Sequence, residues 1–84
     1  MAEILGGIVK DYFAKIGVAG IQLSGELAVG DTIRIHGHTT DFTQEVAGIQ
    51  IEKQAVAKAA AGQAIGIKVK ERVRDHDKVY KVTP

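Results

Sequence analysis

Residues 25–37 read Gly-Glu-Leu-Ala-Val-Gly-Asp-Thr-Ile-Arg-Ile-His-Gly, and this segment is the most informative one for the fold. Gly30 and Asp31 are typical of a tight turn, because glycine adopts positive φ without strain and aspartate hydrogen-bonds nearby backbone groups. Beyond the turn, Ile33 and Ile35 alternate with polar residues, which is the period of a strand with one buried face. The segment therefore predicts that one strand ends, turns at Gly30-Asp31 and leads into a second strand.

The residues before this segment predict a β-hairpin. Positions 7–13 are rich in β-branched and aromatic residues and show no helical period. Ala19, Ile21 and Leu23 then share one face of a second strand. Because only a short turn at 15–17 separates the two strands, we expect them to pair antiparallel.

The longest strand candidate, residues 42–53, changes its apolar face part of the way along. The apolar residues at positions 42 and 46 have one parity, while those at 49 and 51 have the other. A strand with one buried face cannot change parity without an extra residue or a sharp bend. We therefore predict a β-bulge or kink at Ala47-Gly48.

Residues 54–61 contain five alanines and are ambiguous. Alanine has the highest helix propensity, but a helix of this length is marginal in water. We expect a loop with at most one helical turn, and a regular helix remains an open alternative.

The remaining residues predict two further strands. Ile65, Ile67 and Val69 alternate with glycine and lysine, a charged turn follows at 74–77, and residues 79–82 form a last short strand. Six strands with polar turns favour an all-β fold closed into an antiparallel barrel, because closure removes exposed sheet edges. The expected core residues are Ile21, Leu23, Ile33, Ile35, Val46, Ile49, Ile65, Ile67 and Val69.

Length and composition limit the function classes. Eighty-four residues are enough for one domain, which we expect to span 1–84. The chain has no cysteine, so it has neither a disulfide framework nor thiolate chemistry. The N-terminal residues do not resemble a signal peptide, and no apolar run approaches the length of a membrane span. We therefore expect a soluble cytoplasmic protein without a membrane partner.

Two segments resemble domain 2 of the translational GTPases, of which elongation factor Tu is a member. Residues 25–35 resemble the pattern Gly-x-Leu-x-Val-Gly-Asp-x-Ile-x-Ile, and residues 61–67 resemble the family's Ala-Gly-x-x-Val-Gly-Leu segment. Residues 77–80 stand where the family has a Gly-x-Val strand. The resemblance covers about 7–82 and implies a closed six-stranded antiparallel Greek-key β-barrel. In that family the barrel is not catalytic and docks on RNA or on a GTPase domain, which this chain lacks.

The side chains offer little for catalysis or cofactors. The chain contains no Gly-Lys pair, so a phosphate-binding loop for GTP is excluded. The candidate metal ligands are His36, His38 and His76. His36 and His38, with Asp41 nearby, could bind zinc, but solvated loop histidines are the commoner case. Ser24 is a poor candidate for a catalytic nucleophile, because the residues around it do not form a nucleophile elbow. We expect no catalytic residue, no metal and no cofactor, and we predict that the chain is not an enzyme.

Basic residues gather toward the C-terminus. Residues 65–84 contain six lysines and arginines against three acidic residues. Four of the six occupy alternate positions, so an extended chain would place them about 7 Å apart on one face, which suits a nucleic-acid backbone. The alternative is an ordinary solvated exterior. The candidate nucleic-acid-binding residues are Lys68, Lys70, Arg72 and Arg74, with Arg34.

Together these observations favour a non-catalytic binding module of the translation-factor type. It would dock on the backbone of ribosomal RNA or tRNA, or on a translation-related protein, and it would be a monomer that binds no GTP. The alternative is a protein–protein accessory barrel subunit of an enzyme complex, without RNA binding.

Overall fold

The computed structural model describes residues 2–83, and within them every regular element is a β-strand. The expected all-β class is therefore confirmed. The part of the chain that the structure describes contains no helix long and apolar enough to cross a membrane. The strands are β1 (Ala2–Phe13), β2 (Val18–Leu23), β3 (Leu27–Ala28), β4 (Thr32–His36), β5 (Asp41–Glu45), β6 (Ile49–Ile51), β7 (Gln54–Val56), β8 (Lys58–Ala59), β9 (Ala64–Lys68) and β10 (Lys78–Thr83).

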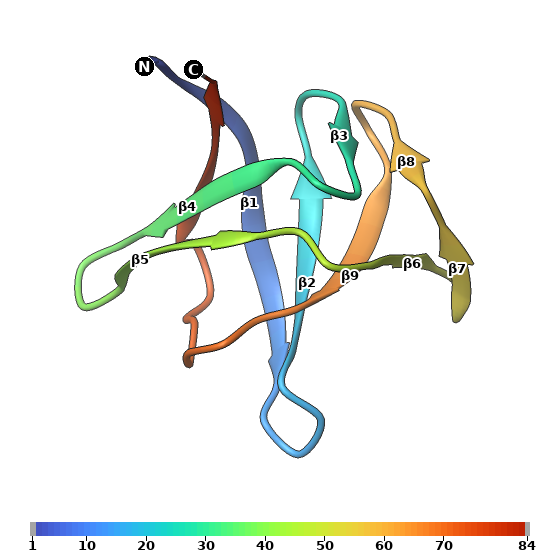
Figure 1. The fold of residues 1–84 in the computed structure, drawn as a ribbon. Coiled ribbons are helices and arrows are strands. Elements are labelled where there is room, and N and C mark those ends of the chain that lie inside the picture. Colours follow the sequence, from blue (N-terminus) through green and yellow to red (C-terminus); the bar gives the residue numbers. More distant parts are fainter. Residues whose placement is uncertain (1, 84) are drawn as a thin grey trace.

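Eight of these strands form one antiparallel sheet in the order β5-β4-β10-β1-β2-β9-β6-β7, and β3 pairs with β8 in a second, two-stranded sheet (Figure 1). Within residues 2–83, no ladder joins the end strands β5 and β7, so the expectation of a closed six-stranded Greek-key barrel is wrong. Between β6 and β9 the pairing is short, since within residues 2–83 only Gln50 and Gly66 pair there.

The sheet nevertheless curls strongly. Only residues 46–48 connect β5, at one end of the sheet, to β6, near the other end. Glu45 and Ile49 are four residues apart in the sequence and therefore lie at most about 14 Å apart, so the two ends of the sheet must lie close together. In Figure 1 the β4–β5 hairpin accordingly crosses in front of β1 and β2. The kink predicted at Ala47-Gly48 is confirmed, and it is this bend that takes the chain around the core.

A single apolar cluster fills the inside of the curled sheet. All nine residues expected in the core are buried. The alternation in β2 and β4 is also as predicted, since Ile21, Ile33 and Ile35 are at most 1% exposed while their neighbours are partly exposed. The buried apolar residues beyond that expectation are Val9, Ala19, Leu27, Phe42, Ala59, Val73 and Val79.

The turns predicted at 15–17 and at Gly30-Asp31 are present. Phe13 pairs with Val18 at the end of the β1–β2 hairpin, which confirms the antiparallel pairing. At the other turn Gly30 has a φ of +96°, and the carboxylate of Asp31 accepts a hydrogen bond from the N–H of Ala28 at 2.9 Å. The turn chemistry of residues 25–37 thus behaves as the sequence indicates.

Residues 54–61 differ from expectation, because they form β7 and β8 rather than a loop or helix. Val56 pairs with Ile49, and Ala59 pairs with Leu27 and is 3% exposed. These tertiary contacts outweigh the helix propensity of the alanines, which is a weak determinant in so short a segment.

A groove on the outer face and a neighbouring cationic segment

A groove of about 640 Å³ lies on the outer face of the sheet, where β9 and β6 diverge. Its wall is mainly aliphatic, and Lys68 is the one charged residue among those that line it. The lining residues are Ile16, Val18, Val29, Ala47, Gly48, Ile49, Gln50, Ala55, Val56, Gly66 and Lys68.

Small residues explain why the outer face is hollow at this point. Gly66 pairs with Gly20 on β2 and with Gln50 on β6, so two of three side chains in this row are missing. A Cβ at Gly66 would lie 3.3 Å from Cγ1 of Val18, which is tight packing. The glycines therefore leave space that side chains occupy elsewhere on a sheet.

Two large apolar side chains stand exposed beside this space. Ile16 is 62% exposed and Val29 is 43% exposed, and both line the groove. They come from the β1–β2 turn and from the turn after β3, which lie far apart in the sequence. Because exposed apolar side chains around a hollow mark interaction sites, the groove is the strongest candidate surface of the described residues.

The four alternating cations lie in a segment that begins at the groove, and we call residues 68–74 the cationic segment. Lys68, Lys70, Arg72 and Arg74 are exposed, while Val69 and Val73 are buried. None of the four forms an ion pair with another residue of the described range 2–83. The Nζ atom of Lys70 lies 5.9 Å from the ring centroid of Phe42.

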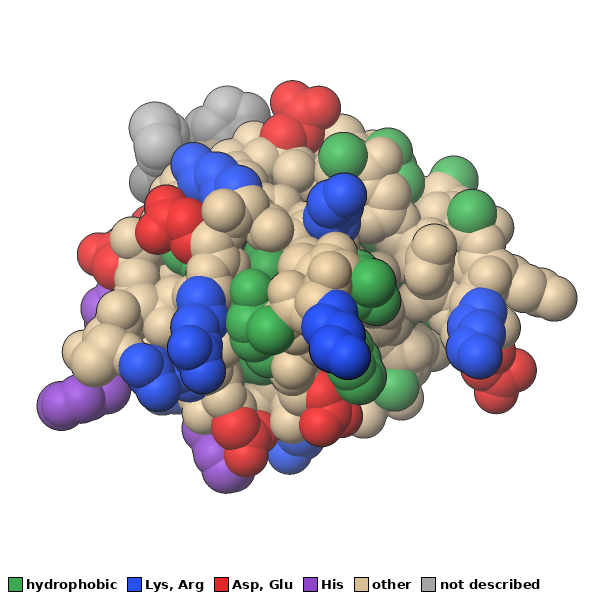
Figure 2. All heavy atoms as spheres, turned by 90° about the horizontal axis from the view of Figure 1, so that it is seen from below, with side chains coloured by type: hydrophobic (Ala, Val, Ile, Leu, Met, Phe, Trp, Pro, Cys, Tyr) green, Lys and Arg blue, Asp and Glu red, His purple; other side chains and the backbone are tan. Residues whose placement is uncertain are grey.

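The geometry of the cationic segment departs from expectation in two ways. Strand β9 ends at Lys68, so the segment is not one long strand. Here the Gln44 side chain takes the position of a neighbouring strand, since its amide donates to the carbonyl of Lys68 and accepts from the N–H of Lys70, each at 2.9 Å. Glu71 is exposed instead of turning inward with Val69. Figure 2 shows blue cationic side chains interspersed with red acidic ones on this side of the molecule.

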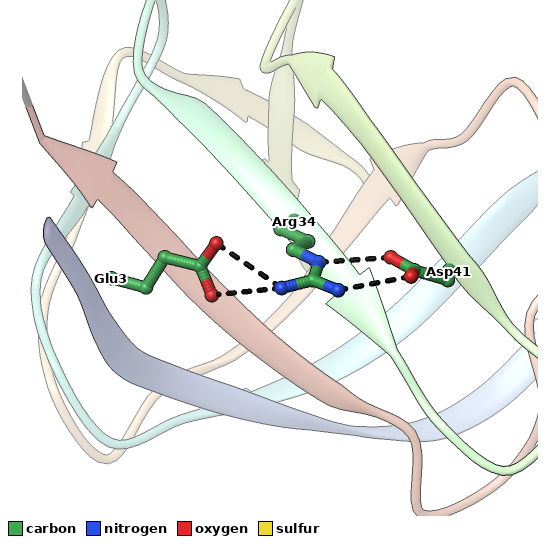
Figure 3. Close-up of polar contacts among 3 residues, drawn as sticks. All are labelled: Glu3, Arg34 and Asp41. Atoms are coloured by element: carbon green, nitrogen blue, oxygen red, sulfur yellow. Dashed lines mark hydrogen bonds and ion pairs between the residues drawn. The ribbon is translucent and has the colours of Figure 1, made fainter. Parts of the chain in front are cut away.

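Arg34 is placed differently from the other four cations. It lies on β4, which β10, β1 and β2 separate from β9 in the sheet. Its Nε and Nη2 atoms donate to the two carboxylate oxygens of Asp41 at 2.8 and 2.9 Å, and Nη1 lies 3.3 Å from both oxygens of Glu3 (Figure 3). The hydrogen bonds with Asp41 raise the pKa of Arg34, and Arg34 in turn lowers the pKa of Asp41. Arg34 therefore joins strands β5, β4 and β1 on the outer face, and its donors are already engaged.

The other candidate residues do not come together in a site. His36, His38 and His76 are all exposed, and Nδ1 of His76 lies 3.3 Å from Asp75. Among residues 2–83 no three metal-ligating side chains form a cluster that could hold an ion. Ser24 is exposed, and its backbone N–H donates to the carbonyl of Gly6.

Comparison with known proteins gives relatives of one kind. No protein-family model matches the chain. A collagenase of Porphyromonas gingivalis is 50% identical over 72 residues, which cover 83% of this chain and 20% of that protein. An uncharacterised protease of Methanocaldococcus jannaschii is 40% identical over 75 residues, covering 88% of this chain and 18% of that protein. The chain thus spans about a fifth of the length of these curated relatives.

The solved structures agree with this comparison at the level of fold. The crystal structure of the C-terminal domain of a Geobacillus thermoleovorans protein described as a U32 peptidase superposes with a TM-score of 0.89. The two sequences are 24% identical, and the match covers 95% of this chain and 93% of that domain. At this identity the likeness shows a shared fold.

These findings correct the functional expectations from the sequence. The resemblance to domain 2 of the translational GTPases is wrong, because the relatives and the structural neighbour are proteins of the protease kind. The interpretation as a translation-factor-like RNA-binding module is wrong for the same reason. The prediction that the chain is not an enzyme is also contradicted by these relatives, which are named as a collagenase and a protease and which this chain matches over about a fifth of their length. A turn followed by alternating isoleucines specifies a β-turn-β unit, which unrelated proteins share.

Proposed function

We propose that this chain is the small β domain of a U32-type peptidase and serves that enzyme as an accessory binding module. The observation that carries the proposal is the match at 50% identity to a segment that makes up only a fifth of a collagenase. The near-complete match to a C-terminal domain that was crystallised by itself supports the view that this segment is a separate domain of a larger protein. An accessory enzyme subunit is also the alternative that the sequence left open.

In this proposal the groove and the cationic segment form the surface that binds the partner. An aliphatic hollow with exposed Ile16 and Val29 favours contact with polypeptide, and the adjoining cations favour a partner that carries acidic groups. We reassign Lys68, Lys70, Arg72 and Arg74 to this contact, while Arg34 has a structural role in the sheet. That residues 1–84 form a single domain, and that the protein is monomeric and cytoplasmic, remain predictions.

A chimera tests the proposal. In the Porphyromonas gingivalis collagenase, the segment that matches this chain is either deleted or replaced by this chain, and kcat/KM for gelatin hydrolysis is measured beside the unaltered enzyme. We expect the deletion to lower kcat/KM and the chimera to restore most of it. Circular dichroism and gel filtration establish that each variant is folded.

Two outcomes would contradict the proposal. One is a folded deletion variant that hydrolyses gelatin as fast as the unaltered enzyme. The other is a folded chimera that is no more active than the deletion variant.

A further inference from the structure

The groove combines an apolar wall with charge of one sign. Its lining includes Lys68 and the neutral amide of Gln50, and it includes no acidic residue. From Lys68 the exposed cations continue along the cationic segment to Arg74, with one exposed carboxylate, Glu71, among them. A ligand that complements both features needs an apolar part and a neighbouring anionic part.

The groove also offers backbone groups that have no partner. Ala47 and Gly48 lie in the bend between β5 and β6, both are exposed, and neither makes a backbone hydrogen bond to another residue of the range 2–83. Their N–H and C=O groups are therefore free to bond to an extended peptide, whereas an alkyl chain would leave them unused. The volume of about 640 Å³ is that of a pocket for several side chains.

We propose that this groove binds an extended peptide in which apolar residues are followed by acidic side chains. The apolar residues pack against Val18, Val56 and the open surface above Gly66, and the carboxylates contact Lys68 and the cationic segment. A single C-terminal carboxylate would use Lys68 alone, whereas the four exposed cations match a run of acidic side chains. The inference names the class of polypeptide that the accessory module binds, and to that extent it rests on the proposed function.

The test uses the 84-residue chain labelled with nitrogen-15 and three synthetic peptides blocked at both ends. The first is acetyl-Ala-Leu-Val-Glu-Glu-Glu-amide. The second replaces the three glutamates with glutamine, and the third replaces the apolar half with Ser-Gly-Ser. We expect the first peptide to shift the backbone amide signals of Ala47, Gly48, Gly66 and Lys68, and the other two to bind at least several-fold more weakly.

Matched variants separate the groove from general surface charge. Lys68→Glu reverses the charge at the groove and is expected to weaken binding of the glutamate peptide about tenfold, which corresponds to ~1.4 kcal/mol. Lys10→Glu makes the same change at an exposed residue of β1 that does not line the groove, and it should leave the affinity within about twofold. Gly66→Ala places a methyl group on the groove floor, where Val18 must yield slightly, and should weaken binding several-fold.

Each other outcome overturns the inference. Equal affinity for the glutamate and glutamine peptides would show that the cations do not contribute to binding. If the shifted signals belong to residues outside the groove, the peptide does not bind there. The same conclusion follows if Lys68→Glu and Lys10→Glu weaken the affinity equally. Binding of sodium decanoate at the same residues, without binding of the peptide, would identify an amphiphile site instead. Because this assay measures binding to the isolated chain, its failure beside an active chimera would refute the peptide site and leave the accessory role intact.

Discussion

Replacing Gln44 should show how much stability comes from one amide that stands in for a neighbouring strand. Its side chain makes two hydrogen bonds of 2.9 Å, one to the carbonyl of Lys68 and one from the N–H of Lys70. A net hydrogen bond contributes about 0.5–1.5 kcal/mol, and partial exposure places these two in the lower half of that range. We expect Gln44→Ala to lower the free energy of unfolding by about 1–2 kcal/mol, a large share of the stability of a domain of this size.

Urea unfolding and amide hydrogen exchange measure this effect. With a slope near 1 kcal/mol per molar urea, the midpoint should fall by about 1–2 M. The N–H of Lys70 should exchange faster, while that of Val69, which donates to the carbonyl of Gly17 at 2.8 Å, should keep more of its protection. Gln44→Glu retains the acceptor for Lys70 and loses the donor to Lys68, so it should show part of the loss. Gln54→Ala, at an exposed glutamine of β7, is the matched control and should stay within ~0.5 kcal/mol. An unchanged midpoint together with unchanged exchange at Lys70 would refute the bridging role of Gln44.

Three further predictions concern the core, the ion pair and a strained turn. Ile67 is 1% exposed, so Ile67→Ala should cost about 2–5 kcal/mol, and a nearly unchanged thermal midpoint would contradict its place in the core. Because Arg34 lowers the pKa of Asp41 below its ordinary 3.8, the stability from this pair is present above pH 3.8 and lost as the pH falls through the lower folded-state pKa. An NMR titration of Asp41, with Asp41→Asn as the control, checks this, and a folded-state pKa at or above 3.8 would exclude it. Glu52 and Lys53 have φ of +50° and +67°, so Glu52→Asn with Lys53→Gly should raise stability by about 1 kcal/mol in thermal unfolding; a loss would show that the native turn is unstrained.

Much of the sheet was predictable because its strands have one buried face. Alternation at Ile33 and Ile35, and at Ile65 and Ile67, follows directly from a period of two residues. The change of parity before Ile49 similarly required a bend, and the structure has one. These features are local, so a single sequence contains them.

The start of β1 was not predictable by the same reasoning. Glycine is depleted in strands, so the pair at positions 6 and 7 gives no sign that the strand predicted from position 7 begins earlier. In the structure β1 starts at Ala2, and Gly7 is needed because β2 approaches closely: a Cβ would lie 2.8 Å from the carbonyl oxygen of Gln22. Such a close approach depends on the partner strand and has no local signal.

The candidate site was predicted only in part. The exposed alternation of Lys68, Lys70, Arg72 and Arg74 was visible in the sequence, because Val69 and Val73 between them are apolar. The groove was not visible, since it brings together residues from four strands, two turns and the β5–β6 connection, and it arises where side chains are missing. The ion pairs of Arg34 with Glu3 and Asp41 likewise depend on strand order, which periodicity does not give.

The position of β10 has a consequence for how the chain folds. Residues 78–83 lie between β1 and β4 in the sheet, so the strand made from the last described residues joins the two halves of the molecule. Ala2 pairs with Thr83, and contacts of this kind close a loop that spans nearly the whole chain. Loop closure over such distances must precede the gain from pairing, and folding is accordingly slow, on the order of milliseconds to seconds, for sheets of this type. Until β10 adds, the edges of β1 and β4 stay open to pairing with other chains, which makes the final strand the step that protects the domain from aggregation.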